Sequence, residues 1–275
     1  MSIDRYAVMG NPIKHSKSPQ IHKAFAEQAD QHMTYTSMLV PEAQFEESVR
    51  RFFAEGGKGL NITVPFKLRA FDLADELTER ALRAKAVNTL WQNNEGQIIG
   101  DNTDGVRMVR DIMHNHDGRL AGKKLLIIGA GGAVRGVLAP VLAENPASLV
   151  LANRTFEKAH HLAEEFTDLG RIEALHLNQL KGPFDWIING TASSLQGEVP
   201  DLPASVIGEH TRVYDMMYGK EITPFNAWAL EHGAEKAFDG LGMLVEQAAE
   251  SFRKWRGVMP STPTVISDLR SAISS

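Results

Sequence analysis

The sequence contains no cysteine, and this absence excludes several kinds of site at once. Disulfide frameworks, thiolate nucleophiles and cysteine-based zinc sites are all ruled out. Long apolar runs are also missing, because the longest, around residues 125–134, is interrupted by glycines and is too short to span a membrane. Residues 1–6 lack the basic stretch and apolar core of a signal peptide. We therefore expect a cytoplasmic protein with no membrane association.

Positive charge is not in excess either, since 34 acidic residues outnumber 29 basic ones and the net charge is −5. This balance gives no general attraction to nucleic acids or to anionic membranes. An anionic ligand must be held by a local site, so we expect a small-molecule ligand and no nucleic acid. The histidines form no convergent ligand set, and we expect no metal. A chain of 275 residues has room for one large or two medium domains.

The N-terminal part of the chain alternates short apolar segments with amphipathic ones. Strands are expected at residues 6–10, 59–64, 87–91 and 97–100, the last two forming a hairpin. Helices are expected at residues 18–28 and from 41 to the glycine pair at 56–57. Ser18 is a candidate N-cap, because Pro19 suits the first helical position. This pattern predicts a first α/β unit.

The central part of the chain alternates strands and helices more regularly. Apolar strand segments are expected at residues 124–128, 149–152, 172–177, 184–188, 213–216 and 236–238. Such alternation predicts a doubly wound α/β fold, in which helices cover both faces of a parallel sheet. The final segments, 241–255 and 262–272, predict two more helices.

A glycine-rich turn follows the strand at 124–128 and opens a helix, with the sequence Gly129-Ala130-Gly131-Gly132-Ala133. Glycines let the backbone approach a pyrophosphate closely, and a helix N-terminus offers free N–H groups and a positive dipole end. The sixth position is Val134, where the usual dinucleotide pattern has glycine, so a purely structural turn is the alternative. The strand–turn–helix order favours nucleotide binding.

The end of the next strand indicates which dinucleotide is bound. NAD-binding folds usually have an acidic residue there, whereas this chain has Asn153-Arg154-Thr155. A carboxylate would repel the extra phosphate of NADP, and a guanidinium binds it. The alternative is that Arg154 is a solvated side chain and Thr155 only caps the following helix. We expect NADP as the cofactor.

Polar side chains cluster at strand ends and helix starts in the N-terminal unit. Ser16 and Ser18 lie beside a helix N-terminus, a favourable place for a carboxylate. Asn61 and Thr63 share one face of a strand. Further polar groups are Lys67, Asn88, Thr89 and residues 102–104. This set suits a polyhydroxylated ligand, although each segment alone has a structural explanation, such as a helix cap or a surface lysine.

Taken in order, these motifs resemble the shikimate dehydrogenase family. The matching strings begin at Gly10 (Gly-Asn-Pro-x-x-His-Ser-x-Ser-Pro), Asn61 (Asn-x-Thr-x-Pro-x-Lys), Ala86 (Ala-Val-Asn-Thr), Asp101 (Asp-Asn-Thr-Asp-Gly), Gly129, Asn153, Tyr214 and Asp239. The resemblance covers nearly the whole chain. It implies reversible, NADPH-dependent reduction of 3-dehydroshikimate to shikimate, a step in chorismate and aromatic amino acid biosynthesis.

The resemblance also implies two domains and a role for each motif residue. Residues 1–104 would bind substrate, with helices at 241–275 packing back on them, and residues 105–240 would form a Rossmann-type NADP domain. The cleft between the domains would hold the substrate against the nicotinamide. Lys67 and Asp104 would be catalytic. The substrate would contact Ser16, Ser18, Asn61, Thr63, Asn88, Asp104, Tyr218 and Gln247. The cofactor would contact Glu79, Gly129, Ala130, Gly131, Gly132, Ala133, Asn153, Arg154, Thr155, Lys158, Met216 and Gly240.

One position departs from the family pattern, since Gly190 stands where many relatives have alanine. This change removes no functional group. Three alternatives stay open: a broader quinate/shikimate enzyme that also uses NAD, a non-catalytic NADP-binding sensor, and a two-domain NADP enzyme for another cyclic substrate such as a folate. The sequence leaves open whether Lys67 transfers a proton or only stabilises charge, and whether the protein is a monomer or a homodimer.

Overall fold

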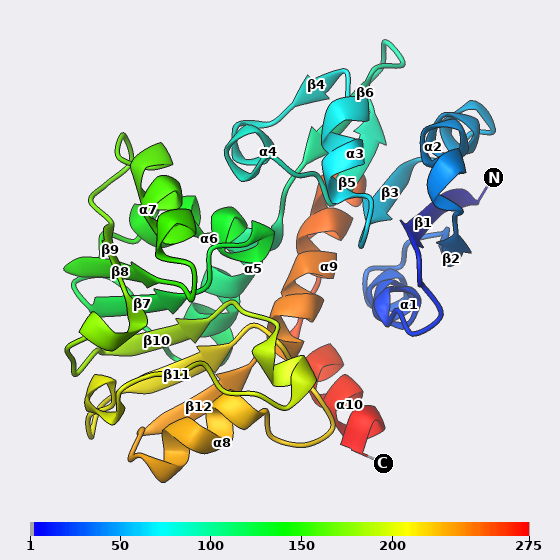
Figure 1. Cartoon of the computed structure of the whole chain (residues 1–275). Helices are drawn as coiled ribbons and strands as arrows, with labels where there is room; N and C mark the ends of the chain where they lie inside the picture. Colours follow the sequence, from blue (N-terminus) through cyan, green and yellow to red (C-terminus); the bar gives the residue numbers. More distant parts are fainter. Residues whose placement is uncertain (1–2, 275) are drawn as a thin grey trace. The chain divides into compact units, whose positions relative to one another are not determined.

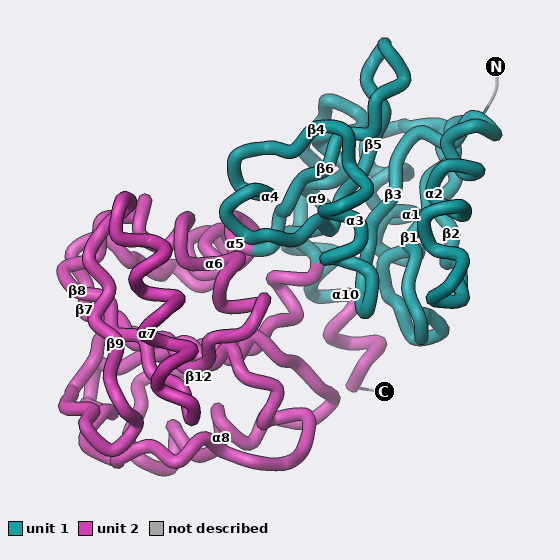
Figure 2. The backbone as a smooth tube through the Cα atoms, turned by 45° about the horizontal axis from the view of Figure 1, so that its top comes forward, with its two compact units in different colours: residues 1–104, 245–267 teal, residues 105–244, 268–275 magenta. Residues whose placement is uncertain are grey.

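The computed structural model describes residues 3–274. The chain forms two compact units, coloured separately in Figure 2. Unit 1 comprises the described residues up to 104 together with 245–267, and unit 2 comprises 105–244 together with the described residues from 268 onward. Each unit has its own six-stranded sheet.

The sheet of unit 1 has the strand order β2-β1-β3-β5-β6-β4. Its strands are β1 (Asp4–Gly10), β2 (Met33–Leu39), β3 (Gly59–Ile62), β4 (Glu76–Leu77), β5 (Thr89–Gln92) and β6 (Ile98–Asp101). β1 pairs in parallel with β2 and β3, whereas β5 is antiparallel to β3 and β6 (Figure 1). The helices of this part are α1 (Ser18–Gln28), α2 (Phe45–Ala54) after the short η1 (Glu42–Gln44), α3 (Lys67–Leu73), α4 (Glu79–Ala84) and α9 (Leu241–Arg256), whose residues from 245 belong to unit 1.

Helical periodicity explains how the helices of unit 1 bury one side. The buried positions of α2 include Phe45, Val49, Phe52 and Phe53, which repeat at helical spacing and pack against the core of the sheet. α9 contributes aromatic residues to the same unit. Its Phe252 ring meets the Phe25 ring edge-on with centroids 5.9 Å apart. Helix α9, from the last part of the chain, therefore contributes to a core that begins near the N-terminus.

The sheet of unit 2 is parallel throughout and has the order β12-β11-β10-β7-β8-β9. Its strands are β7 (Lys124–Ile128), β8 (Ser148–Ala152), β9 (Glu173–Leu175), β10 (Trp186–Asn189), β11 (Arg212–Asp215) and β12 (Lys236–Asp239). The strand order reverses between β7 and β10, which is where doubly wound sheets bind their ligands. The predicted doubly wound fold is confirmed.

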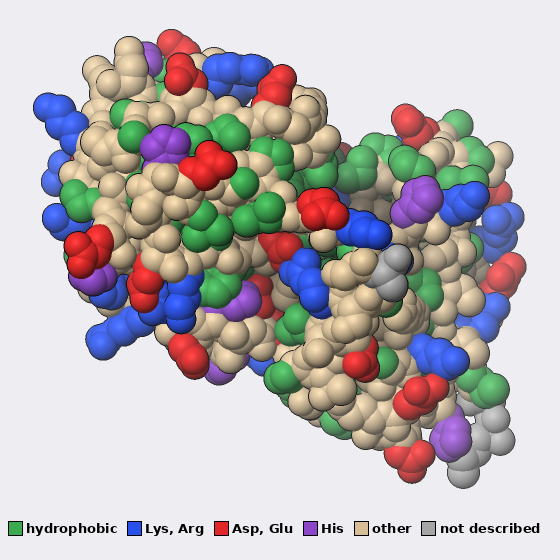
Figure 3. Space-filling model, turned by 90° about the horizontal axis from the view of Figure 1, so that it is seen from below, with side chains coloured by type: hydrophobic (Ala, Val, Ile, Leu, Met, Phe, Trp, Pro, Cys, Tyr) green, Lys and Arg blue, Asp and Glu red, His purple; other side chains and the backbone are tan. Residues whose placement is uncertain are grey.

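The helices of unit 2 lie before β7, between successive strands and after β12 (Figure 1). They are α5 (Asp104–Arg110) with its π-helical continuation η2 (Asp111–Asn115), α6 (Gly132–Ala143), α7 (Phe156–Glu165), α8 (Pro224–Glu231), the short η3 (Leu177–Gln179), η4 (Ser193–Gln196) and η5 (Ala204–Val206), and α10 (Pro263–Ser274), whose first residues belong to unit 1. Among the helices of residues 3–274, none is long and apolar enough to cross a membrane. Basic and acidic side chains are mixed on the face of the molecule in Figure 3.

One local expectation is wrong, and several elements of the structure were not predicted. α1 begins at Ser18 itself, its N-cap is Lys17, and no side chain caps the helix, so the predicted N-cap role of Ser18 is wrong. The sequence patterns also did not identify β2, α3 and α4. β2 is an edge strand with mostly exposed or half-buried side chains, and α3 and α4 have seven and six residues, so neither hydrophobic periodicity nor length marks them clearly.

Candidate active site

Lys67 and Asp104 form an ion pair at the starts of two helices. A turn closed by the Phe66 N–H and the Thr63 carbonyl, 3.0 Å apart, leads into α3 at Lys67. Asp104 is the first residue of α5. The Lys67 Nζ atom lies 2.8 Å from Asp104 Oδ2, and the two side chains are 29% and 6% exposed. The lysine is thus open to a ligand, whereas its carboxylate partner is enclosed.

The buried carboxylate is oriented by the asparagines around it. Asn88 Nδ2 donates to Asp104 Oδ1 at 2.6 Å. The Asp104 N–H donates to Asn102 Oδ1 at 3.0 Å, and the Thr103 N–H donates to Asn88 Oδ1 at the same distance. Because a buried charge is costly without hydrogen bonds, these contacts help to keep the carboxylate in place beside Lys67.

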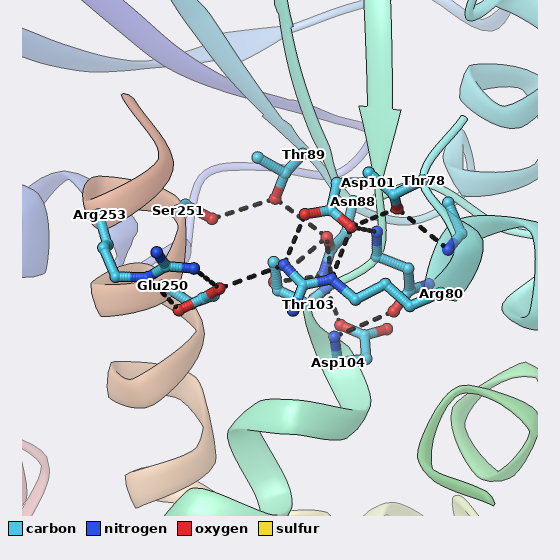
Figure 4. Close-up of polar contacts among 12 residues, drawn as sticks. Thr78, Arg80, Asn88, Thr89, Asp101, Thr103, Asp104, Glu250, Ser251 and Arg253 are labelled. Atoms are coloured by element: carbon cyan, nitrogen blue, oxygen red, sulfur yellow. Dashed lines mark hydrogen bonds and ion pairs between the residues drawn. The ribbon is translucent and has the colours of Figure 1, made fainter. Parts of the chain in front are cut away.

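Unit 1 holds a second cluster of charged side chains, formed by Arg80, Asp101, Glu250 and Arg253 and shown in Figure 4. The fully buried Asp101 accepts two hydrogen bonds from Arg80, at 2.7 and 2.6 Å, and one from the Thr78 hydroxyl at 2.6 Å. Glu250 on α9 lies 3.2 Å from Arg80 and 2.7 Å from Arg253. Burial raises the pKa of Asp101, but the hydrogen bonds and positive charge of Arg80 outweigh it, so the net pKa is lowered.

Ser16 and Ser18 lie at the N-terminus of α1. The Ser18 N–H donates to Ser16 Oγ at 3.3 Å, and both serines are half-buried. Gly10, the last residue of β1, packs closely against Thr63. A Cβ atom at Gly10 would come within 2.5 Å of the Thr63 Cγ2 atom, so the absence of a side chain permits this contact. The structure therefore places the hydroxyl-bearing residues Ser16 and Ser18 at the N-terminus of α1, and Thr63 beside Gly10 at the end of β1.

The glycine turn of unit 2 has the geometry that a pyrophosphate requires. Gly129 has φ = +114°, a conformation that other residues rarely adopt. A Cβ atom at Gly131 or Gly132 would meet no heavy atom within 4 Å, so the space over the turn is open. α6 starts at Gly132, and no side chain forms a cap hydrogen bond there. These residues fit the phosphates of a dinucleotide.

A cavity of about 740 Å³ lies at the carboxyl ends of the unit 2 strands, a volume in the usual range of roughly 300–1,000 Å³ for ligand pockets. Its lining includes Asn153 and Arg154 after β8, His176, and Thr191 and Ser193 after β10. Asn153 Nδ2 donates to the Thr155 carbonyl at 2.8 Å. Glu198 and Asp201 also line the cavity, so it has both signs of charge. The guanidinium, amide and hydroxyl groups fit an adenosine bearing a phosphate.

Met216 and Gly240 are neighbours in unit 2. A Cβ atom at Gly240 would lie 2.2 Å from the Met216 carbonyl oxygen, so only glycine permits this approach. Gly190 is equally constrained, because its Cβ would lie 2.4 Å from Val134 Cγ2 and 3.2 Å from the Met216 sulfur. The residue that departs from the family pattern therefore leaves room for Val134 at the switch point of the sheet.

Three sequence-family models match successive parts of the chain. They describe a "Shikimate dehydrogenase substrate binding domain" at residues 8–90, a "Shikimate / quinate 5-dehydrogenase" at 111–196 and a "Shikimate 5'-dehydrogenase C-terminal domain" at 240–269. A protein of Alkalilimnicola ehrlichii named shikimate dehydrogenase (NADP(+)) is 57% identical over 267 residues, which cover 97% of this chain and 98% of that protein. The chain belongs to the shikimate dehydrogenase family.

Solved structures of similar proteins share this fold along nearly the whole chain. An Ael1 enzyme from Pseudomonas putida is 47% identical, with a TM-score of 0.93 and coverage of 97% of this chain and 98% of that one. A shikimate 5-dehydrogenase from Thermus thermophilus, solved with NADP(H) and shikimate, is 30% identical, with a TM-score of 0.86 and coverage of 98% and 100%. The resemblance inferred from motifs is confirmed.

Most residues predicted from the shikimate dehydrogenase motifs fall into two groups, one in each unit. The predicted substrate residues in unit 1 are Ser16, Ser18, Asn61, Thr63, Asn88, Asp104 and the half-buried Gln247 on α9, with Lys67 as their catalytic neighbour. The predicted cofactor residues in unit 2 are Gly129–Ala133, Asn153, Arg154, Thr155, Lys158, Met216 and Gly240. Two predicted residues lie in the other unit from their group, since Tyr218 is in unit 2 and Glu79 is in unit 1.

Two further details of this family site emerge only from the structure. Thr155 occupies the N-cap position of α7 but its side chain forms no capping bond, so its hydroxyl is not used for that purpose. Asn61 is only 4% exposed, and its amide is hydrogen-bonded to protein atoms. Sequence reasoning missed Tyr35 and Ser251, which hydrogen-bond to Asn61 from segments far away in the chain. Periodicity in a single segment gives no signal for such contacts.

Proposed function

We propose that this protein is an NADP-dependent shikimate dehydrogenase, which reversibly reduces 3-dehydroshikimate to shikimate with NADPH. The observation that carries the proposal is the ion pair of Lys67 and Asp104, 2.8 Å apart, within a hydroxyl- and amide-rich cluster. Close relatives bear the name shikimate dehydrogenase (NADP(+)), at 57%, 54% and 56% identity. The product enters chorismate and aromatic amino acid biosynthesis.

In this proposal unit 1 binds the substrate. Ser16 and Ser18 hold its carboxylate, because their hydroxyls lie at the N-terminus of α1. The ring hydroxyls are bound by Thr63, Asn88, Asp104 and Gln247, with Asn61 and Tyr218 close by. Asn88 and Asp104 already share a hydrogen bond, so a ring hydroxyl bridging them would be fixed in direction.

Lys67 and Asp104 carry the chemistry on the enzyme side. The chemistry that NADPH would supply when bound is hydride transfer to the C3 carbonyl carbon of the substrate. The carbonyl oxygen then gains negative charge, and the Lys67 ammonium stabilises this charge. The same ammonium donates a proton to the oxygen. Asp104 holds the Lys67 ammonium toward the reacting oxygen through the contact at Oδ2. In the reverse direction the amine of Lys67 accepts the proton from the shikimate hydroxyl.

Unit 2 binds NADP in this proposal. The pyrophosphate lies over Gly129–Ala133, where the open space above Gly131 and Gly132 accommodates it. Asn153, Arg154, Thr155 and Lys158 bind the adenosine and its 2′-phosphate, and no carboxylate follows β8 directly to repel that phosphate. Met216 and Gly240 border the nicotinamide, with Glu79 near it.

The same proposal extends to the organisation of the protein. We assign residues 1–104 with the returning C-terminal helices to the substrate domain, and 105–240 to the NADP domain. We further propose a cytoplasmic enzyme that functions as a monomer or a homodimer.

The test is the absorbance change at 340 nm of the purified protein with shikimate or quinate, each combined with NADP⁺ or NAD⁺. We expect fast reduction with shikimate and NADP⁺ and little with the other pairs. Comparable rates with quinate or NAD⁺ would indicate a broader quinate/shikimate enzyme. Absence of turnover with every pair would contradict the proposal and favour an NADP-binding sensor or a different substrate.

A further inference from the structure

A buried line of hydrogen bonds leads through unit 1 to the Asp104 carboxylate. The Tyr35 hydroxyl donates to Asn61 Oδ1 at 2.7 Å, and Asn61 Nδ2 donates to Thr89 Oγ1 at 3.2 Å. The Thr89 hydroxyl donates to Asn88 Oδ1 at 3.0 Å, and Asn88 Nδ2 donates to Asp104 Oδ1 at 2.6 Å. Each donor in this line points toward the carboxylate.

The direction of the line is fixed by backbone groups that cannot reverse. Asn88 Oδ1 accepts from the Thr103 N–H at 3.0 Å, so the amide nitrogen of Asn88 must face Asp104. Asn61 Nδ2 donates to the Asn88 carbonyl at 3.2 Å, so the oxygen of Asn61 must face Tyr35. Because the oxygen of Asn88 faces Thr89, the Thr89 hydroxyl must donate to it. Of the two amide protons of Asn61, one goes to the Asn88 carbonyl, and Thr89 and Ser251 share the other.

Ser251 on α9 completes the surroundings of Thr89. Its Oγ atom lies 3.0 Å from Thr89 Oγ1 (Figure 4). The same Oγ atom lies 2.9 Å from Asn61 Nδ2. Because the Thr89 proton is directed to Asn88, Ser251 donates its own proton to Thr89. Thr89 and Ser251 are both 0% exposed, so water does not replace either contact. Buried polar networks of this kind lose order when one member is removed.

We propose that Thr89 and Ser251 are positioning residues for the reaction, holding the Asn88 amide so that it donates to Asp104 beside Lys67. This inference rests on the proposed function. Neither hydroxyl touches the substrate in this account. Their effect passes through Asn88, whose amide bonds Asp104 directly and thereby helps to fix the carboxylate that orients the lysine.

The central test compares Thr89→Val, which removes the hydroxyl at nearly constant shape, with Thr89→Ser, which keeps it. We expect Thr89→Val to lower kcat by about 10–100-fold, since small misplacements of reacting groups have effects of this size. The KM for NADP⁺ should stay unchanged. The acidic limb of kcat against pH should move to higher pH, because a carboxylate with weaker hydrogen bonds is more easily protonated. Thr89→Ser should restore kcat to within about threefold.

A matched control removes another buried threonine hydroxyl, from unit 2. The Thr211 hydroxyl donates to the Phe184 carbonyl at 2.6 Å, and Thr211 is 1% exposed. We expect Thr211→Val to lower the melting temperature but to leave kcat and its pH profile as in the unchanged protein. Equal loss of kcat in Thr211→Val and Thr89→Val would overturn the inference, as would equal loss in Thr89→Ser and Thr89→Val.

Ser251→Ala is the second variant and is measured even if Thr89→Val does not fold. It should lower kcat by roughly 3–10-fold, less than the loss of Thr89, because the Thr89 bond to Asn88 remains. In the Thr89→Val background it should add little, since both residues act through the same amide. Unchanged kcat and pH profile in Ser251→Ala and Thr89→Val alike would refute the positioning role.

A readout independent of turnover is the exchange protection of the Asn88 side-chain amide protons, measured by NMR. Thr89→Val should reduce this protection, and Thr211→Val should not. If the unchanged protein shows no turnover of shikimate, the proposed function fails while the NMR comparison still tests the network. Unaltered protection in Thr89→Val would show that the hydroxyl does not hold the amide.

Discussion

The Lys67 ammonium is partly exposed and lies against a buried carboxylate, so its removal should affect the chemical step more than binding. We expect Lys67→Ala to lower kcat by about 10²–10⁴-fold, with much less change in the KM for shikimate. The exposed Lys23, which contacts only Glu27 at 3.9 Å among the described ion pairs, supplies the control Lys23→Ala. A Lys67→Ala protein with near-normal kcat in the 340 nm assay would contradict the catalytic role.

Arg154 is exposed and lines the cavity of unit 2, where the proposed function places the 2′-phosphate of NADP. We expect Arg154→Asp to weaken NADPH binding far more than NADH binding, because the new carboxylate repels the extra phosphate. Titration of each cofactor by the quenching of protein fluorescence measures the two dissociation constants. Equal weakening of both cofactors would show that Arg154 has a structural role only.

Gly190 and Val134 are a packing pair at the switch point of the unit 2 sheet. A Cβ atom at Gly190 would lie 2.4 Å from Val134 Cγ2, so Gly190→Ala should destabilise unit 2 by roughly 1–3 kcal/mol through overpacking. Adding Val134→Ala should recover most of this loss by making room for the new methyl group. Urea unfolding of the single and double variants measures both effects. A neutral Gly190→Ala would mean that neighbouring side chains shift easily.

Among the elements, α4, β6 and α9 are joined by the cluster of Arg80, Asp101, Glu250 and Arg253. Burial raises the pKa of Asp101, but Arg80 and Thr78 lower this pKa by more than burial raises it. Burial likewise raises the pKa of Glu250, and Arg253 and Arg80 lower it by more. Both carboxyl pKa values are therefore below their ordinary range. A lowered folded pKa contributes stability that is present above the unfolded value, near 4, and is lost as pH falls through the folded value. The stability of unit 1 should therefore fall progressively below about pH 4.

Asp101→Asn tests the contribution of this cluster. At neutral pH the variant should lose about 3 kcal/mol of unfolding free energy, because Arg80 then keeps only Glu250 as a charged partner in the cluster. Its stability should also change less with pH below about pH 4, since one of the titrating carboxyls is gone. Thermal unfolding at several pH values measures both effects. An equally steep acid dependence in Asp101→Asn would exclude Asp101 as a source.

The elements also show which local structure can be read from sequence. The α2 residues Phe45, Val49 and Phe52 repeat at helical spacing, and the glycine turn after β7 separates strand from helix, so both were predicted. β2 was not, because at the edge of its sheet it has few buried side chains and its fold depends on backbone pairing with β1. Pairing between distant segments produces no periodic signal in either one.

At the scale of the whole molecule, unit 1 depends on both ends of the chain. Phe252 packs on Phe25, and Trp255 stacks on Tyr6 with ring centroids 4.8 Å apart. A chain ending at Gly240 keeps the twelve strands of the described residues but lacks α9 and α10. We expect its unit 1 to lose cooperative unfolding, because a large part of its aromatic core is missing. Circular dichroism and proteolysis measure this, and a protease-resistant unit 1 in the shortened chain would contradict it.

The sequence by itself determined the doubly wound fold, the family and the identity of the main motif residues, because these depend on short patterns within single segments. Glycines at the turn after β7 and Arg154 after β8 are examples. The tertiary structure decided what surrounds those residues. Ser251 reaches Asn61 across 190 positions of sequence, and Val134 meets Gly190 from another strand–helix unit. Hydrogen-bond direction and close packing depend on distances between segments, which only the folded chain sets.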